Sequence, residues 1–177
     1  AAVKMADFYR SHPRLPDDKV PIWDFDVDQP GFVPRWDYRK ADFQTIPRDA
    51  SAAAITASAL LELVDYVQPQ QRHTYLALGK TILQSLGSAK YSSKVGENGI
   101  FILKHSVGSM PHKGETDVPL VYADYYYLEA MMRWHKHVDE SKQRMMQEWK
   151  AMNVQKAAAL AHFRHQKFGM FIHCGLY

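Results

Sequence analysis

A short aromatic and acidic run, PIWDFD at residues 21–26, is the first segment whose side chains could do chemistry. Trp23 and Phe25 offer flat apolar faces, and Asp24 and Asp26 offer hydrogen-bond acceptors. A pyranose ring has apolar C–H faces and a rim of hydroxyl groups, so this mixture suits sugar binding. Alternatively, the aromatic side chains anchor a long loop and the aspartates cap turns.

A second candidate is the basic and acidic pair in PRDASAAA, residues 47–54. Arg48 could bind a carboxylate or a sulfate through two guanidinium N–H groups, helped by the backbone N–H groups of the helix that follows. Alternatively, Asp49 caps that helix and Arg48 pairs with a neighbouring acid. Both interpretations can hold at once.

The third candidate is HSVGSMPHK, residues 105–113, which we predict to be a polar loop around Gly108. Its hydroxyl, imidazole and ammonium side chains are suited to binding an anionic oxygen group; they are those of His105, Ser106, Ser109, His112 and Lys113. Alternatively, it is a polar surface loop without a ligand. The two histidines lack a third ligand at a recognisable spacing, so we expect no metal. A catalytic triad cannot be inferred, because triads are defined by geometry and not by sequence order.

Three consecutive tyrosines at residues 125–127 form the fourth candidate, within VYADYYYLEA. They cannot all face one way on a helix, so at least one is expected in a pocket or at a seam between helices. The alternative is that they serve core packing.

Helical patterns dominate the elements that must position these residues. The first twelve residues read as the end of an amphipathic helix. The next helix starts at Asp49 or Ser51 and places Ile55, Ala59, Leu63 and Val67 on one face. Another runs from Pro69 to a C-terminal cap at Gly87. A helix from about Val118 to His135 has a predicted inner face of Val121, Tyr125, Leu128 and Met132.

The last forty residues or so differ in character. Residues 139–165 are polar and rich in helix formers, which predicts an exposed, linker-like helix. The final KFGMFIHCGLY alternates with period two and has apolar residues on both faces, as in a strand buried inside a sheet. We therefore expect a fragment whose chain ends where a sheet begins.

Composition excludes several classes of protein. The 177 residues are 46% hydrophobic and 12% aromatic, which indicates a packed globular core. A formal net charge of +3, with cations scattered among acids, does not favour nucleic acid as a partner. Cys174 is the only cysteine, so one chain cannot form a disulfide. No apolar run is long enough to span a membrane, and no signal peptide is visible at the start.

Four motifs together resemble a known family. PIWDFD, PRDASAAAITASALLEL, ILKHSVGS and DVPLVYADYYYLEA have the order and spacing of the C-terminal part of unsaturated glucuronyl hydrolases, glycoside hydrolase family 88. The resemblance covers about residues 1–136 and implies an all-α fold, part of an (α/α)6 toroid. It further implies an enzyme that hydrolyses unsaturated uronic acid from disaccharides released by a lyase. In the implied mechanism an aspartic acid protonates the C4=C5 vinyl ether and water adds at C5. The resemblance implies that no cofactor is needed.

The same resemblance implies roles for particular residues. The family's catalytic aspartates lie in the N-terminal half of the toroid, so no catalytic residue is assigned to this chain. Substrate-binding roles are implied for the rim of the pocket, formed by Trp23, Arg48, His105, Ser106 and Ser109. The Ser106 and Ser109 loop resembles one that contacts sulfate in some members, but Pro111 replaces the lysine expected there.

The tail FRHQKFGMFIHCGLY resembles the first strand of the (β/α)8 barrel of α-L-fucosidases, glycoside hydrolase family 29. In that family the histidine that ends this strand contacts the sugar, which implies a substrate-binding role for His173. Barrel sites lie at the C-terminal ends of strands, and this placement agrees.

We therefore expect three regions: a partial toroid over 1–136, a helical linker over 137–166, and the start of a barrel over 167–177. The expected partners are an unsaturated uronate oligosaccharide and the missing N-terminal half of the toroid, with self-association through exposed apolar surface. A bacterial source is implied, with periplasm or cytoplasm as the compartment. The alternatives are a non-catalytic carbohydrate-binding or scaffold module, and a part of a bifunctional glucuronyl hydrolase and fucosidase.

Overall fold

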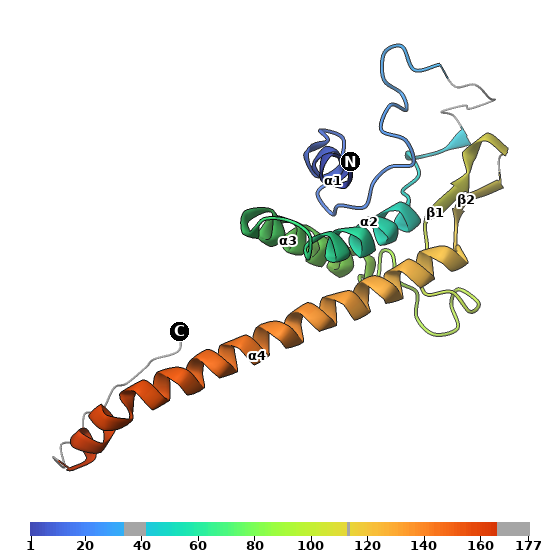
Figure 1. Cartoon of the computed structure of the whole chain (residues 1–177). Helices are drawn as coiled ribbons and strands as arrows, with labels where there is room; N and C mark the ends of the chain where they lie inside the picture. Colours follow the sequence, from blue (N-terminus) through green and yellow to red (C-terminus); the bar gives the residue numbers. More distant parts are fainter. Residues whose placement is uncertain (34–41, 113, 166–177) are drawn as a thin grey trace. The chain divides into compact units, whose positions relative to one another are not determined.

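The computed structural model describes residues 1–33, 42–112 and 114–165. The order of elements is α1 (Ala2–Ser11), α2 (Ala50–Leu63), α3 (Pro69–Leu86), β1 (Ser106–Ser109), a 3-10 turn η2 (Met110–His112), β2 (Gly114–Val118) and α4 (Val121–His165) (Figure 1). The chain divides into two compact units, residues 1–135 and 136–177. The described part is mostly helical, as predicted. No helix among the described residues is long and apolar enough to cross a membrane.

Local signals position the ends of α2 and α3. The Asp49 carboxylate accepts hydrogen bonds from the backbone N–H groups of Ser51 at 3.0 Å and Ala52 at 3.2 Å, which confirms the predicted cap. Pro69 occupies the first turn of α3 and Gly87 is its C-terminal cap, again as predicted. Each of these signals acts within one turn of helix, so the neighbouring sequence is sufficient to specify it.

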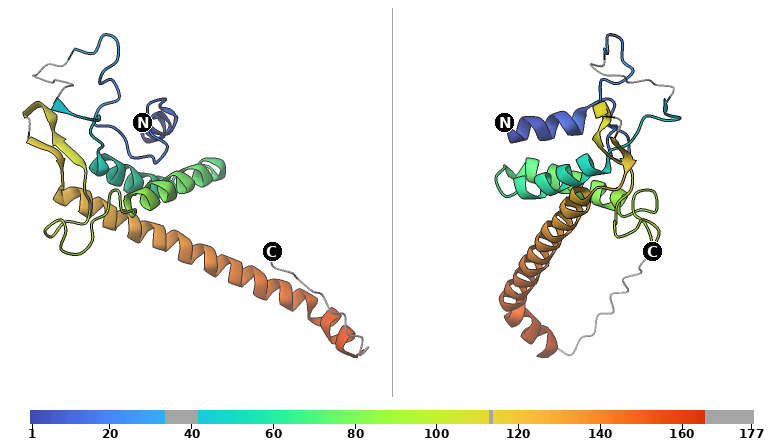
Figure 2. Two further views of the ribbon diagram at one scale, coloured as in Figure 1. Left: turned by 180° about the vertical axis from the view of Figure 1, so that it is seen from behind. Right: turned by 90° about the vertical axis from the view of Figure 1, so that its right-hand side faces the viewer.

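Small residues bring α2 and α3 together, and Figures 1 and 2 show the two helices side by side. Ala53, Ala54 and Ala57 of α2 are fully buried, and Ile82 and Leu86 of α3 are buried in the same core cluster. Short side chains allow close approach of the helix axes, and burial of the larger apolar side chains between them supplies the main stabilisation.

The burial of α2 and α4 differs from our prediction. On α2 the predicted inner residue Ile55 is 39% exposed, whereas Leu60 and Leu61 are buried. On α4 the predicted inner face of Val121, Tyr125, Leu128 and Met132 is exposed, and Ala123, Tyr127 and Ala130 are buried instead. Both helices carry apolar residues on two faces, so periodicity alone could not decide which face this chain covers.

A polar clamp joins α2 to the first part of α4. Arg133 donates hydrogen bonds to the Ser58 carbonyl oxygen at 2.8 Å and to its hydroxyl oxygen at 2.6 Å. The same guanidinium lies 2.8 Å from a Glu62 carboxylate oxygen and 3.3 Å from one of Glu129. Ser58 is buried, and these contacts satisfy its polar atoms, which fixes the register between the two helices.

The prediction of a loop in the segment that follows His105 is wrong. We predicted a polar loop over 105–113, but β1 and β2 pair as an antiparallel hairpin with Val107 opposite Thr116 and Ser109 opposite Gly114. The strands are short and rich in Ser and Gly, and they lack the alternation of apolar and polar residues that identifies a strand. The hairpin lies against the start of α2, because Ala50 donates its N–H to the His105 carbonyl oxygen at 2.9 Å.

Residues 136–165 continue α4 to its end at His165, so the helical prediction for residues 139–165 is confirmed. Large apolar side chains are exposed there, namely Met145, Met146, Trp149, Met152 and Val154. The predicted barrel strand at 167–177, including His173, lies outside the described residues.

Candidate functional site

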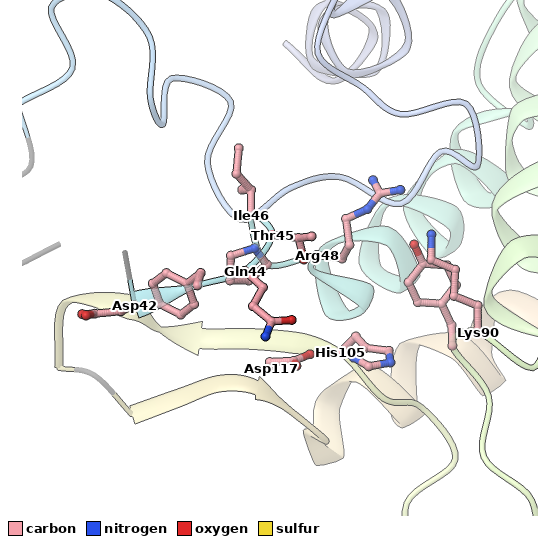
Figure 3. Close-up of a pocket in the computed structure, with 11 residues that line it drawn as sticks. Asp42, Gln44, Thr45, Ile46, Arg48, Lys90, His105 and Asp117 are labelled. Atoms are coloured by element: carbon pink, nitrogen blue, oxygen red, sulfur yellow. Dashed lines mark hydrogen bonds and ion pairs between the residues drawn. The ribbon is translucent and has the colours of Figure 1, made fainter. Parts of the chain in front are cut away.

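A pocket of about 390 Å³ lies where segments distant in the sequence meet. It is lined by residues 42–48, by Lys90 and Tyr91 after α3, by His105 before β1, and by Asp117 of β2. Figure 3 shows the side chains of His105 and Asp117 next to one another, below Arg48 in this view. Two of the predicted site residues, Arg48 and His105, therefore share one pocket.

Backbone pairing brings Arg48 to the pocket. Ile22 and Arg48 form an isolated antiparallel bridge, the Trp23 N–H donates to the Pro47 carbonyl oxygen at 3.1 Å, and the Asp49 N–H donates to that of Pro21 at 2.9 Å. The PIWDFD segment is thus the backbone partner of the segment that carries Arg48.

The Arg48 guanidinium is held by acceptors of the protein itself. Its Nη2 atom lies 2.9 Å from both carboxylate oxygens of Asp18, and its Nη1 atom donates to the Val20 carbonyl oxygen. The interpretation in which Arg48 pairs with a neighbouring acid is therefore confirmed. A guanidinium has five N–H donors, so donors remain for a ligand.

Asp18 also binds the residues that follow α3. The Lys90 Nζ atom and the Tyr91 hydroxyl each lie 2.8 Å from the Oδ2 atom of Asp18. Burial raises the pKa of the Asp18 carboxyl, but hydrogen bonds from Lys90, Tyr91 and the Val20 N–H, together with the Arg48 charge, outweigh burial and lower it. The hydrogen bond to Asp18 is the main cause of a raised pKa for Lys90.

This pKa shift predicts a pH-dependent contribution to stability. Because the folded-state pKa of Asp18 is below its ordinary value, the carboxylate stabilises the fold above about pH 4, and the contribution is lost as pH falls through the lowered pKa. The difference in unfolding free energy between the wild type and Asp18→Asn should be constant near neutral pH and shrink below about pH 4. Urea denaturation at a series of pH values measures it.

The control for this titration is Asp17→Asn, which changes the adjacent, exposed aspartate. Its difference from the wild type should be small at every pH, because exposed charges contribute little. A difference for Asp18→Asn that stays constant down to about pH 2, below the range in which aspartates titrate, would contradict the assignment.

His105 and Asp117 form a close pair at the pocket. The His105 Nδ1 atom lies 2.6 Å from a carboxylate oxygen of Asp117, and Tyr91 packs edge-on against the imidazole with ring centroids 6.2 Å apart. Both paired residues have left-handed backbone, with φ of 63° and 58°. Such backbone is unfavourable for residues with a side chain and is often found at functional sites. The pairing orients the imidazole and leaves Nε2 for another partner.

The two serines of the motif do not line this pocket. Ser106 is fully buried, and within the described part of the chain its hydroxyl has no hydrogen-bond partner. The Ser109 hydroxyl lies 2.7 Å from the Nδ1 atom of His112. Contacts of either serine with a substrate remain predictions.

The aromatic residues of PIWDFD pack within the protein. Phe25 stacks on His12 with ring centroids 3.9 Å apart, and Trp23 meets Phe32 edge-on at 6.5 Å. The Asp24 carboxylate accepts the Asp26 N–H at 2.8 Å, as in a capped turn. These contacts support the interpretation in which this run anchors a loop, and Trp23 is not among the residues that line the pocket.

Sequence reasoning missed Asp18, Lys90, Tyr91 and Asp117. Asp117 is twelve residues from His105 and meets it only through the hairpin, which the sequence did not reveal. Asp18 binds partners 30 and 72 residues away, at Arg48 and Lys90. Within residues 1–33, 42–112 and 114–165, no group of three or more His, Cys, Asp or Glu side chains could hold a metal ion.

The curated proteins that this chain matches are unsaturated glucuronyl hydrolases and unsaturated chondroitin disaccharide hydrolases. No protein family model matches the sequence. The chain is 44% identical over 126 residues to an unsaturated glucuronyl hydrolase of Formosa agariphila, covering 71% of this chain and 28% of that protein. It is 35% identical over 127 residues to an unsaturated chondroitin disaccharide hydrolase of Streptococcus agalactiae, covering 70% and 28%. The chain spans only 28–30% of the length of the curated relatives that it matches.

Solved structures agree with these relatives. The crystal structure of an unsaturated glucuronyl hydrolase specific for heparin matches 76% of this chain at 44% identity with a TM-score of 0.64, over 32% of its own length. That of the Streptococcus agalactiae unsaturated glucuronyl hydrolase matches 73% at 32% identity with a TM-score of 0.57, over 29% of its length. Over about 71% of its length, this chain is therefore similar in sequence and fold to unsaturated glucuronyl hydrolases, and the helical fold corresponds to part of their (α/α) toroid.

Proposed function

We propose that this chain is part of a glycoside hydrolase that removes unsaturated uronic acid from lyase-generated glycosaminoglycan disaccharides by hydration of the vinyl ether. The observation that carries the proposal is 44% identity, over 71% of the chain, to a protein named for that activity. The pocket supports it, because its lining combines two cations, a histidine and two carboxylates, which suit a sugar acid with hydroxyl groups.

In this proposal the described residues bind and orient the sugar. Arg48 and Lys90 attract its negative charge, and His105, oriented by Asp117, offers a hydrogen bond to a hydroxyl group. The resemblance to glucuronyl hydrolases implies that the catalytic aspartates lie in the N-terminal half of the toroid. In this proposal the catalytic acid therefore lies in a complementary part of the enzyme.

Two exposed apolar faces support a complementary polypeptide as partner. A groove of about 720 Å³ lies between α1 and α2 and is lined by Met5, Phe8, Ile55, Ala59, Leu63 and other residues. The exposed stripe of α4 is Val121, Tyr125, Leu128 and Met132. Apolar surface of this extent is typical of an interface, and in a helical toroid it would contact neighbouring helices.

The proposal is tested by complementation. The part of the Formosa agariphila relative that this chain does not match is co-expressed with this chain. Turnover of an unsaturated chondroitin disaccharide is followed by loss of the vinyl ether absorbance. We expect turnover only when both polypeptides are present, and binding without turnover by this chain alone.

Each remaining outcome has a meaning. Turnover by this chain alone would contradict the assignment of the acid to the partner. Absence of both binding and turnover in the complemented pair would contradict the proposed function. As a matched control, the Arg48→Met variant of this chain is co-expressed with the same part of the relative. The pair should still assemble, but it should lose affinity for the substrate.

We further propose that residues 167–177 begin a fucosidase-like barrel. The support is the sequence FRHQKFGMFIHCGLY alone, of which residues 166–177 lie outside the described residues. The coding sequence downstream of Tyr177 tests the proposal, since it should encode alternating strands and helices in the same reading frame. A stop codon directly after Tyr177 would contradict it.

A further inference from the structure

The carboxylate of Asp18 binds several of the residues that line the pocket. Asp18 is not among the lining residues, yet it accepts hydrogen bonds from Arg48, Lys90 and Tyr91, all of which line the pocket. The donors come from two segments, before α2 and after α3, so Asp18 joins parts of the chain that local sequence cannot hold together.

The two cations keep donors for a ligand while Asp18 holds them. Asp18 and Val20 engage the Nη1 and Nη2 atoms of Arg48, which leaves its Nε–H free of these contacts. An ammonium group has three N–H donors, and Asp18 accepts one from Lys90. Lys90 also lies 4.9 Å from the centroid of the Tyr91 ring, which further restricts its position.

The charges at the pocket predict opposite effects of an Asp18 substitution on sugar binding, depending on whether Asp18 acts through its charge or by holding side chains in position. Arg48 and Lys90 carry two formal positive charges, and the carboxylates of Asp18, Asp42 and Asp117 carry three formal negative charges; the other titratable groups at the pocket are Tyr91 and His105. Loss of the Asp18 charge makes the pocket more positive, which by electrostatics alone would tighten binding of an anionic sugar. Loss of the hydrogen bonds releases two long side chains, which weakens binding.

We propose that Asp18 is a positioning residue for sugar binding, which holds the Arg48 and Lys90 side chains in the orientation that meets an anionic sugar. The identity of the ligand rests on the proposed function, whereas the positioning itself rests on the hydrogen bonds around Asp18. Positioning by one partly buried acceptor reduces the conformational entropy that the two side chains lose when a ligand binds.

The first test is calorimetric titration of the full chain with an unsaturated chondroitin disaccharide. Asp18→Asn should weaken binding about tenfold, as expected for the loss of charge-assisted hydrogen bonds. Tyr91→Phe removes one donor to Asp18 and keeps the ring, and should weaken binding about threefold. The matched control Asp17→Asn removes the same charge from the adjacent exposed residue and should bind like the wild type.

The second measurement does not depend on the sugar. In the wild type the Arg48 Nη–H groups that donate to Asp18 and Val20 should give sharp NMR signals that exchange slowly with water, and these signals should broaden or shift in Asp18→Asn but not in Asp17→Asn. Equal or tighter sugar binding by Asp18→Asn, or by Tyr91→Phe if Asp18→Asn does not fold, would overturn the proposal. If the wild type binds no disaccharide, the proposed sugar binding by this chain is contradicted. If the Arg48 signal is the same in Asp18→Asn as in the wild type, the proposed positioning role of Asp18 is contradicted, whatever the result with the sugar.

Discussion

The Gly79→Leu variant is expected to lower the free energy of unfolding by about 3 kcal/mol. A Cβ atom on Gly79 would lie 3.1 Å from the Cγ and Cδ2 atoms of Leu61 on α2, so a larger side chain must push α2 and α3 apart. The better helix propensity of leucine recovers only about 1 kcal/mol. Urea denaturation followed by circular dichroism measures the change.

Ala77→Leu is the matched control, because residue 77 lies on the same helix and is exposed. That variant should be as stable as the wild type within about 0.5 kcal/mol. Equal stability of Gly79→Leu and the wild type would show that α2 and α3 do not pack closely at this point.

The second large effect concerns assembly. The double variant Ile55→Lys, Ala59→Lys places two charges in the groove between α1 and α2, where we propose that the complementary polypeptide packs. Burial of an unpaired charge costs several kcal/mol, so turnover by the complemented pair should fall about 100-fold or more. The fold of this chain alone should persist, because both side chains are exposed.

The control adds the same charge elsewhere. Val95→Lys, Ile100→Lys changes two exposed apolar residues of the loop after α3, and turnover by the complemented pair should be unaffected. Full turnover by the groove variant would exclude the groove as the docking surface. Sedimentation of each chain alone tests self-association, which the groove variant should reduce.

The exposed apolar faces explain why the hydrophobic pattern was misleading. The pattern on α2 and α4 correctly indicated helices that bury an apolar stripe. Of the stripe that we selected for α2, Ile55 and Ala59 are exposed, whereas Leu63 and Val67 are partly buried against the core. The stripe that we selected on α4, Val121 to Met132, is exposed. A helix of a closed toroid packs on more than one side, so it carries more than one apolar stripe.

Features that depend on near neighbours or on the order of motifs could be predicted from the sequence. The cap at Asp49 and the ends of α3 at Pro69 and Gly87 follow from interactions within one turn. Similarity to glucuronyl hydrolases over about 71% of the chain was recognisable in four motifs, and the relatives confirm it.

Three features depend on contacts between distant parts of the chain and could not be predicted from the sequence. They are the covered face of each helix, the hairpin at residues 106–118, and the charges that meet at the pocket. Arg48 is adjacent in sequence to Asp49, yet it binds Asp18, and His105 binds Asp117. The reason is physical: helix caps are satisfied locally, whereas burial and ion pairing depend on groups that folding brings together from distant parts of the chain.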